Sequence, residues 1–283
     1  MSLKFTWFGA ACILMESEEH SVLFDPFFEN IPANFDSRNL FSHIDKIFIT
    51  HGHFDHIAFN QELLEVSDAG IRVPSGVKKN IMRWCQTKNK NRVYRPFTFR
   101  KTDVEHSSEK LASRINKIQK NEIIDISDKV SVFPFRSNHV RYDTAIFRDK
   151  LSVFSNYKYI PSAIKLALHY MKKQVLGYRV TFDDKKIVTF GSMPHRITRE
   201  MQGMGPLDVL FVPMAGKKAK NLVVPALRLI DAFQPKIVIP NHQNDFFPPL
   251  SDDTDVGLLR EELGRQYPEI KFFEPVLGEH FQI

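Results

Sequence analysis

The sequence predicts an α/β protein with a metal site assembled at the ends of its strands. Short apolar segments typical of strands alternate with helical patterns, and three of these segments lead into histidines. The mostly apolar segment Lys46–Ile49 runs directly into a histidine-rich loop, while the predicted strands Lys129–Phe135 and Lys236–Ile239 lead to His139 and His242. Histidines delivered by separate strands are what a metal site built from several loops requires.

The loop after the first of these strands reads Thr50-His51-Gly52-His53-Phe54-Asp55-His56 and carries four side chains that can bind a cation. Gly52 suits a tight loop, because it adopts backbone conformations that a larger residue would resist. Neutral imidazoles and one carboxylate suit a zinc-like ion better than calcium or magnesium, which prefer oxygen ligands. A histidine-rich surface loop without a ligand role is the alternative, but the order His-x-His-x-Asp-His at a strand end is specific and favours a metal.

Composition bounds the class of protein. The 283 residues can form one large domain or two small ones, and since no stretch resembles a linker we expect a single domain over 1–283. With 43% apolar and 25% charged residues the composition is that of an ordinary globular protein. Only Cys12 and Cys85 are present, which argues against a disulfide framework and a cysteine metal site and favours the cytoplasm.

Charge and hydropathy limit the classes of molecule that this protein is expected to bind. Every apolar run is short, so we expect no membrane span and no signal peptide. The net charge of +6 favours an anionic substrate or a mild affinity for nucleic acid. The stretch Lys88–Lys101 interleaves basic and aromatic residues, which is typical of a nucleic-acid patch but suits two strands with solvated outer faces equally well.

The N-terminal third predicts an antiparallel meander of three strands, Lys4–Phe8, Cys12–Glu16 and Val22–Phe24. The third strand ends in Asp25, which is expected to orient the histidine loop from outside the ligand shell, with capping of a turn as the alternative. Glu29–His43 is expected to be an irregular loop. The helices Asn60–Ala69 and Ser75–Asn89 are predicted on either side of the strand Ile71–Pro74, and His106–Lys120 is predicted to be an exposed helix.

The segment 149–176 is predicted to be an insertion that covers the site as a lid. It holds a helical pattern at Ser162–Lys173, with tyrosines on and beside it, and a core helix of the main fold is the alternative. The C-terminal part then predicts a hairpin, two further strands, two helices and a closing strand: Tyr178–Phe182, Lys186–Phe190, Asp208–Val212, Asn221–Phe233, Lys236–Ile239, Asp252–Gln266 and Ile270–Phe273.

These motifs together resemble the metallo-β-lactamase superfamily of metal-dependent hydrolases, and within it the subgroup that includes L-ascorbate-6-phosphate lactonase. The run from Ile49 to His56 resembles the hallmark of the superfamily, and Leu23-Phe24-Asp25-Pro26 resembles its first acidic motif. Matches to its opening strand and to its late motifs follow in the expected order, at Phe5–Gly9, Asp208–Pro213 and Ile239–His242. The resemblance implies a four-layer αβ/βα sandwich, with the metals at one edge.

The resemblance also implies the ligand sets. His51, His53 and His139 would form one metal site, and Asp55, His56 and His242 would form the other, for one or two divalent ions, zinc first, with manganese or iron as alternatives. This chain departs from the family at Gly191-Ser192, where an aspartate usually bridges both metals. A serine hydroxyl binds divalent metal weakly and brings no charge. His195, Asp143, Asp245, or a phosphate or carboxylate of the substrate could take the place of the bridge.

The implied activity is hydrolysis of a small anionic ester, lactone or phosphodiester by a metal-bound hydroxide, with Asp55 placing the hydroxide. Two alternatives stay open. The first is a degenerate member that binds metal without turnover, since the bridge is missing. The second is a hydrolase that processes nucleic acid, favoured by the positive charge and by Lys88–Lys101. The sequence specifies neither the substrate nor the oligomeric state.

Overall fold

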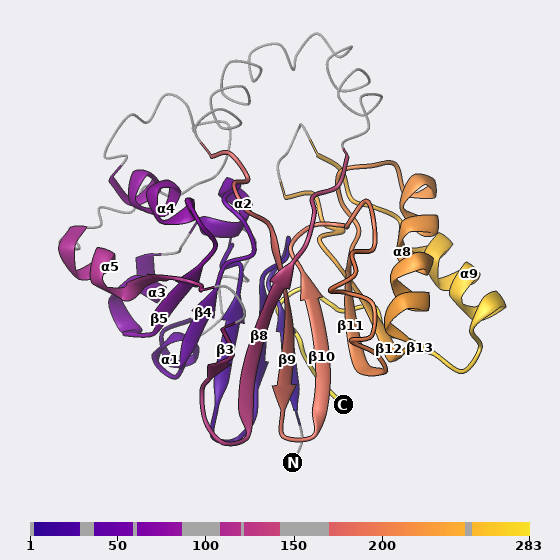
Figure 1. The fold of residues 1–283 in the computed structure, drawn as a ribbon, viewed down its shortest axis with the longest axis horizontal. Coiled ribbons are helices and arrows are strands. Elements are labelled where there is room, and N and C mark those ends of the chain that lie inside the picture. The colour runs from indigo at the N-terminus through magenta and orange to yellow at the C-terminus, as the bar shows by residue number, and fades with distance from the viewer. Residues whose placement is uncertain are drawn as a thin grey trace, which may run out of the picture.

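The computed structural model describes residues 3–28, 37–58, 61–86, 108–119, 122–141, 170–246 and 251–283. Within these residues the strands form two seven-stranded sheets that lie face to face (Figure 1). The first sheet has the order β14 (His280–Gln282), β1 (Lys4–Trp7), β2 (Ile13–Glu16), β3 (Ser21–Phe24), β4 (Lys46–Phe48), β5 (Gly70–Val73), β6 (Ile115–Lys117). The second has the order β13 (Lys271–Phe272), β12 (Pro235–Asn241), β11 (Leu207–Pro213), β10 (Lys185–Phe190), β9 (Leu176–Phe182), β8 (Val130–Arg136), β7 (Ile124–Asp125).

The two sheets share one pattern of strand pairing. From β14 to β3, and from β7 to β10, neighbouring strands are antiparallel. From β3 to β6, and from β10 to β13, they are parallel. Because parallel strands end at the same edge of a sheet, the loops after β3, β4, β10, β11 and β12 gather at one edge of the molecule.

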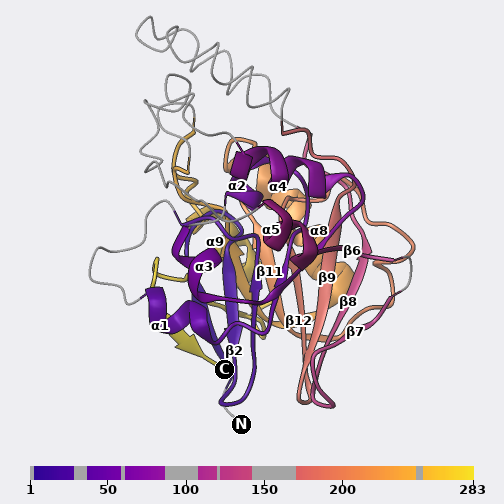
Figure 2. The same ribbon diagram turned by 90° about the vertical axis from the view of Figure 1, so that its left-hand side faces the viewer.

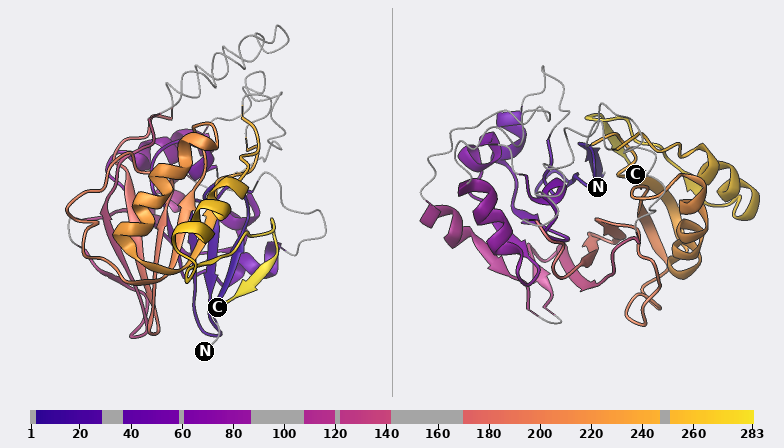
Figure 3. Two further views of the ribbon diagram at one scale, coloured as in Figure 1. Left: turned by 90° about the vertical axis from the view of Figure 1, so that its right-hand side faces the viewer. Right: turned by 90° about the horizontal axis from the view of Figure 1, so that it is seen from above.

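Helices cover the outer face of each sheet (Figures 2 and 3). The first sheet carries α1 (Ser37–Ser42), α2 (Phe54–Ile57), α3 (Gln61–Val66), α4 (Val77–Gln86) and α5 (Ser108–Arg114). The second carries α8 (Lys220–Phe233) and α9 (Gly257–Gln266). This arrangement confirms the four-layer αβ/βα sandwich of the metallo-β-lactamase fold.

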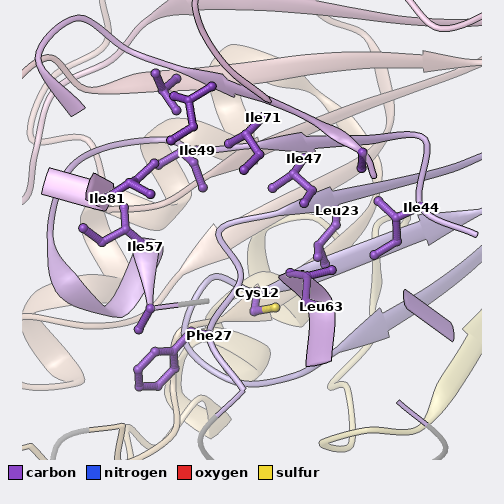
Figure 4. Close-up of a cluster of buried hydrophobic side chains, with 14 of the residues drawn as sticks. Cys12, Leu23, Phe27, Ile44, Ile47, Ile49, Ile57, Leu63, Ile71 and Ile81 are labelled. Carbon is purple, nitrogen blue, oxygen red and sulfur yellow. The ribbon is translucent and has the colours of Figure 1, made fainter. Parts of the chain in front are cut away.

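Three apolar clusters hold the layers together, and the alternation of strand side chains explains them. In β4, Ile47 points to the helices, where it meets Leu63 of α3 and Ile81 of α4 in a buried cluster (Figure 4). The next residue, Phe48, points the other way and joins Phe24 and Tyr178 between the two sheets. A third cluster lies between the second sheet and the helices α8 and α9. By the same alternation Thr50 falls on the side between the sheets, just beyond the apolar core.

Several expectations about the elements are corrected by the structure. The segment 29–43 contains the helix α1, the helix predicted at Asn60–Ala69 ends at Val66 and Gly70 begins β5, and Phe54–Ile57 of the histidine loop forms the short helix α2. His106–Lys120 is not one helix, because the chain leaves α5 after Arg114 and pairs as β6 along β5, which buries Ile115. The strands β7 and β14 were not predicted. Each is very short: β14 pairs with β1 from the opposite end of the sequence, and β7 forms a hairpin with the next strand, β8.

The predicted lid lies mostly outside the described residues, as do Lys88–Lys101 and Asp143. Its described end, residues 170–176, differs from the prediction. Residues 170–173 are not helical, Tyr170 is buried among the apolar side chains under the first sheet's helices, and Leu176 is the first residue of β9. Among the described helices none has the length and apolar character that a membrane crossing requires.

Candidate metal centre

Six potential ligands meet at the edge where the parallel strands end. Four of them follow β4: His51, His53, Asp55 and His56. The last two lie inside α2, which Figure 1 shows in the upper part of the molecule, away from both termini. His139 follows β8 and His242 follows β12. The structure therefore brings together side chains from three separate strand ends, in two groups of three.

The first group is His51, His53 and His139. One ligand atom from each lies within 4.8 Å of the others, and His51 Nε2 is 3.1 Å from His53 Nδ1. The ring of His139 has its centroid 5.0 Å from that of His51 and 4.8 Å from that of His53. His51 and His139 are buried, and His53 is partly exposed, so His53 is the member of this group that meets solvent.

The second group is Asp55, His56 and His242, and all three side chains are buried. Asp55 Oδ2 lies 3.2 Å from His242 Nε2 and 3.4 Å from His56 Nε2. The two groups adjoin, since the ring centroids of His51 and His56 are 3.9 Å apart.

The spacing of these atoms fits a small divalent ion. Ligand atoms at zinc distances around a tetrahedral ion are about 3.3 Å apart. The three short distances in the two groups, 3.1, 3.2 and 3.4 Å, agree with that spacing. The donor atoms are imidazole nitrogens in the first group, and imidazole nitrogens with a carboxylate oxygen in the second, all of which are ordinary zinc ligands.

Asp25 fixes the orientation of the first loop. Its Oδ1 accepts a hydrogen bond from the backbone N–H of Thr50 at 2.7 Å, and its Oδ2 accepts from Thr50 Oγ1 at 2.6 Å and from His56 Nδ1 at 2.8 Å. Because the Thr50 hydroxyl gives its proton to Asp25, it accepts from His51 Nδ1, 3.0 Å away. Both imidazoles thus carry their proton on Nδ1 and leave the Nε2 lone pair for a metal.

His139 is oriented by a different contact. Its Nδ1 lies 3.0 Å from the carbonyl oxygen of Val140, and a carbonyl can only accept, so Nδ1 carries the proton here too. Two further residues that were expected near the metals touch this stretch of backbone. Ser192 Oγ accepts from the Val140 N–H at 3.1 Å, and His195 Nδ1 donates to the His139 carbonyl oxygen at 2.9 Å.

Burial and neighbouring imidazoles keep the first group neutral. Burial, followed by the effects of His56, His53 and His139, holds the pKa of His51 well below its usual range. Burial likewise lowers the pKa of His53 to about 4, although Asp55 opposes the shift. Burial, together with His53, lowers the pKa of His139 to about 3. Neutral imidazoles are the form that binds metal.

The second group has the opposite electrostatics. Burial alone would lower the pKa of His56, but the carboxylates of Asp55 and Asp25 outweigh it and raise the pKa to about 10. Burial alone would also raise the pKa of Asp55, yet His56 and His242 hold that pKa well below its usual range. The carboxylates of Asp55 and Asp25 therefore favour a positive charge at this position, which either a protonated His56 or a divalent ion held at its Nε2 would supply.

Backbone strain concentrates at the same edge. Asp25 has φ +43° and His242 has φ +60°, in the left-handed region that residues other than glycine rarely adopt. The His242 N–H donates to the carbonyl oxygen of Ala10, itself at φ +42°, at 2.7 Å. Such conformations persist only where the surroundings impose them, and they are typical of functional sites.

Gly191 is needed for close packing beneath the site. A Cβ at this position would overlap Thr50 Oγ1 and would lie 2.7 Å from Asp25 Oδ2. The second sheet therefore approaches the Asp25–Thr50 pair through a backbone without a side chain. The sequence singles out Gly191-Ser192 only for its missing carboxylate, and this steric requirement is visible only in the structure.

Asn80 also escaped the sequence reasoning, because a polar residue inside an amphipathic helix gives no signal of function. It is buried in α4, and its Nδ2 donates to the carbonyl oxygens of Gly52 at 2.7 Å and of Met171 at 2.9 Å. It thereby ties the histidine loop to the segment that precedes β9.

Asp245 is not part of either group. Its carboxylate accepts a hydrogen bond from the hydroxyl of Ser251, and its N–H donates to Asp253 Oδ1 at 2.8 Å. These contacts serve the conformation of the loop after His242.

Comparison with known proteins gives the family. A model described as the beta-lactamase superfamily domain matches residues 20–243, a span that includes all six side chains of the two groups. The chain belongs to this family.

Relatives and solved structures agree with this assignment. A UPF0173 protein of Pyrococcus abyssi is 21% identical over 245 residues, 86% of this chain and 85% of that relative. A UPF0173 metal-dependent hydrolase of Salinibacter ruber is 38% identical over 66 residues, 23% of this chain, and the match spans only 29% of that relative's length.

Two solved structures share the fold. Igni18, a metallo hydrolase of Ignicoccus hospitalis, has a TM-score of 0.62 at 15% identity and covers 100% of this chain and 99% of its own. CmlA, a diiron β-hydroxylase of Streptomyces venezuelae, has a TM-score of 0.56 at 14% identity and covers 100% of this chain and 53% of its own. At these identities the likeness establishes the fold alone.

The packing at Gly191 can be tested by Gly191→Ala. The added methyl group would push against Thr50 and Asp25, so we expect the free energy of unfolding to fall by about 2–4 kcal/mol. Gly264→Ala is the matched control, because nothing lies within 4 Å of a Cβ at Gly264 inside α9. That variant should be unchanged or more stable by up to about 1 kcal/mol. Denaturant unfolding of chelator-treated protein measures both, and equal stabilities of the two variants would contradict the packing argument.

Proposed function

We propose that the protein is a metal-dependent hydrolase that acts on a small anionic ester, lactone or phosphodiester. The observation that carries the proposal is the pair of adjoining ligand groups, one buried between carboxylates and one partly open to the outside at His53. Relatives named metal-dependent hydrolases support it. The resemblance to the L-ascorbate-6-phosphate lactonase subgroup supports a substrate that carries a phosphate or carboxylate.

The roles that we propose for the residues follow from the geometry. His51, His53 and His139 would hold one ion, and Asp55, His56 and His242 would hold the other. A divalent ion at these positions supplies a water molecule of lowered pKa and polarises the carbonyl or phosphoryl oxygen of the substrate. Asp55 would hold the attacking water by hydrogen bonding as well as bind metal, and Asp25 would keep His51 and His56 in the tautomer that faces the ions.

Zinc is the ion that we propose first, because five imidazoles and one carboxylate suit its preferences. Manganese and iron are the alternatives, and the diiron neighbour in the fold comparison makes iron the one to measure beside zinc. A second candidate function is binding of metal without turnover, which the neutral Ser192 in place of a carboxylate favours.

Two measurements test the proposal. Elemental analysis of protein purified without a metal-binding tag should give one or two divalent ions per chain. A panel of lactones, phosphate esters and phosphodiesters should then show hydrolysis that a chelator abolishes and zinc, manganese or iron restores. Metal at full occupancy with no turnover on the whole panel would favour the binding protein over the hydrolase.

The first ligand group can be tested by His53→Ala. Loss of one of three ligands should remove most metal from this group, with a fall in melting temperature, because metal binds the folded state. With free metal 100-fold above its dissociation constant the lost stabilisation is about 2.7 kcal/mol. His43→Ala is the control, since His43 is exposed and precedes β4, at the opposite end of that strand. Unchanged metal content in His53→Ala would remove this residue from the ligand set.

The role of Ser192 can be tested by Ser192→Asp. Within the two groups Asp55 is the sole carboxylate, so an added negative charge beside His139 should raise the number of ions bound per chain. The same charge should weaken binding of phosphate, because it lowers the positive charge that attracts an anion. Titration of metal and of phosphate into both proteins in one buffer measures the two effects. If both titrations match the wild type, Ser192 lies away from the ions and is an ordinary turn residue.

A further inference from the structure

The segment 170–175, which leads into β9, is fixed against the histidine loop. The N–H of Gly52 donates to the carbonyl oxygen of Lys172 at 2.9 Å, and the N–H of Leu176 donates to the carbonyl oxygen of Thr50 at 2.9 Å. These two hydrogen bonds bracket His51, and Gly52 separates His51 from His53. The segment therefore lies directly beside two of the three residues of the first ligand group.

Contacts on both sides of Lys172 hold the segment in place. The buried side chain of Asn80 bridges the Gly52 and Met171 carbonyl oxygens, and Gln174 Oε1 accepts a hydrogen bond from the N–H of Ser75 at 3.2 Å. A Cβ at Gly52 would lie 2.7 Å from the Met171 carbonyl oxygen, so only glycine permits this approach. Tyr170 anchors the start of the segment in the apolar cluster under the helices of the first sheet.

Two adjacent lysines in this segment have different surroundings. Lys172 is exposed, and its positive charge is felt at both His53 and His139. Among the described residues no carboxylate pairs with its ammonium. Lys173 has φ +57°, and its side-chain carbons Cγ and Cδ lie 3.4 Å from a Cβ placed at Gly76, the residue before α4. The backbone thus holds Lys172 beside Gly52, between two residues of the first ligand group, whereas the side chain of Lys173 packs beside Gly76.

We propose that Lys172 binds the anionic group of the substrate, a phosphate or carboxylate held next to the ions of the first ligand group. The inference rests on the proposed function for the presence of an anionic substrate. The side-chain ammonium of Lys172 is a point charge on a long, flexible stem. The backbone of the same residue is fixed, because its carbonyl oxygen accepts the hydrogen bond from Gly52 in the histidine loop. A cation placed in this way neutralises an anion beside the metal centre without competing for the metal.

The experiment compares Lys172→Ala with Lys173→Ala as a matched control, and Lys172→Arg as the variant that keeps the charge. Inorganic phosphate is the probe, titrated calorimetrically into metal-loaded protein at low and high ionic strength. Lys172→Ala should bind phosphate about tenfold more weakly, which corresponds to about 1.4 kcal/mol. Lys173→Ala should bind as the wild type does, and Lys172→Arg should retain most of the affinity. The difference between Lys172→Ala and the wild type should shrink at high ionic strength, because salt screens an exposed charge.

The outcomes separate this inference from the proposed function. Equal phosphate affinity of Lys172→Ala and the wild type would overturn the role of Lys172, even if the wild type hydrolyses a substrate of the panel. Equal weakening in Lys172→Ala and Lys173→Ala would also overturn it, since a general positive field would then explain the effect. Loss of metal in Lys172→Ala would show instead that the residue supports the ligand loop. With a hydrolysed substrate in hand, Lys172→Ala should raise KM more than it lowers kcat.

Discussion

The geometry of the candidate metal centre depends on the buried carboxylate of Asp25. It accepts three hydrogen bonds, two from Thr50 and one from His56, and through the Thr50 hydroxyl it also sets the proton position on His51. One carboxylate thus orients a ligand in each of the two groups. Its own position follows from the pairing of β3 with β4, where Phe24 lies opposite Phe48 and the Asp25 N–H donates to the Phe48 carbonyl oxygen at 2.9 Å. A buried, fully hydrogen-bonded carboxylate resists displacement, because each lost contact would leave a polar group unpaired in the interior.

The repeated strand pattern of the two sheets explains why the ligands can meet. Asp25 follows β3 in the first sheet, and Gly191 follows β10, the strand at the same place in the second sheet. The two residues lie next to each other because Gly191 has no side chain to separate the sheets. The histidines come from strand ends of both sheets, His51 after β4 in the first sheet and His242 after β12 in the second. The face-to-face sheets therefore provide the frame, and single residues at the strand ends provide the chemistry.

The sequence predicts the frame well and singles out six side chains that the structure brings together, for identifiable reasons. Strands such as Lys129–Phe135 have clear periodicity, and the loop from His51 to His56 has a spacing that few other sites share. Elements that depend on long-range pairing were missed, as for β14, which has three residues and is held by β1. Side-chain contacts between residues that are distant in the sequence were missed for the same reason. Neither the contact between Asn80 and Met171 nor the fit of Gly191 over Thr50 leaves a local pattern that a single sequence could reveal.

The two ligand groups differ in the charge that surrounds them: carboxylates lie at the second group, and neutral or positive groups lie at the first. An ion in the second group would meet the carboxylate of Asp55 directly and that of Asp25 through His56. An ion in the first group would meet three neutral imidazoles, the neutral hydroxyl of Ser192 close by and the positive charge of Lys172. Like charges at short range in a partly buried site cost free energy unless an anion joins them. Under the proposed function, the second group would therefore retain a cation readily, whereas the first group would hold its cation best together with an anion. Under the proposed function, a substrate that carries its own negative charge would supply what the first group lacks, so that binding of the substrate would also complete the charge balance of the candidate metal centre.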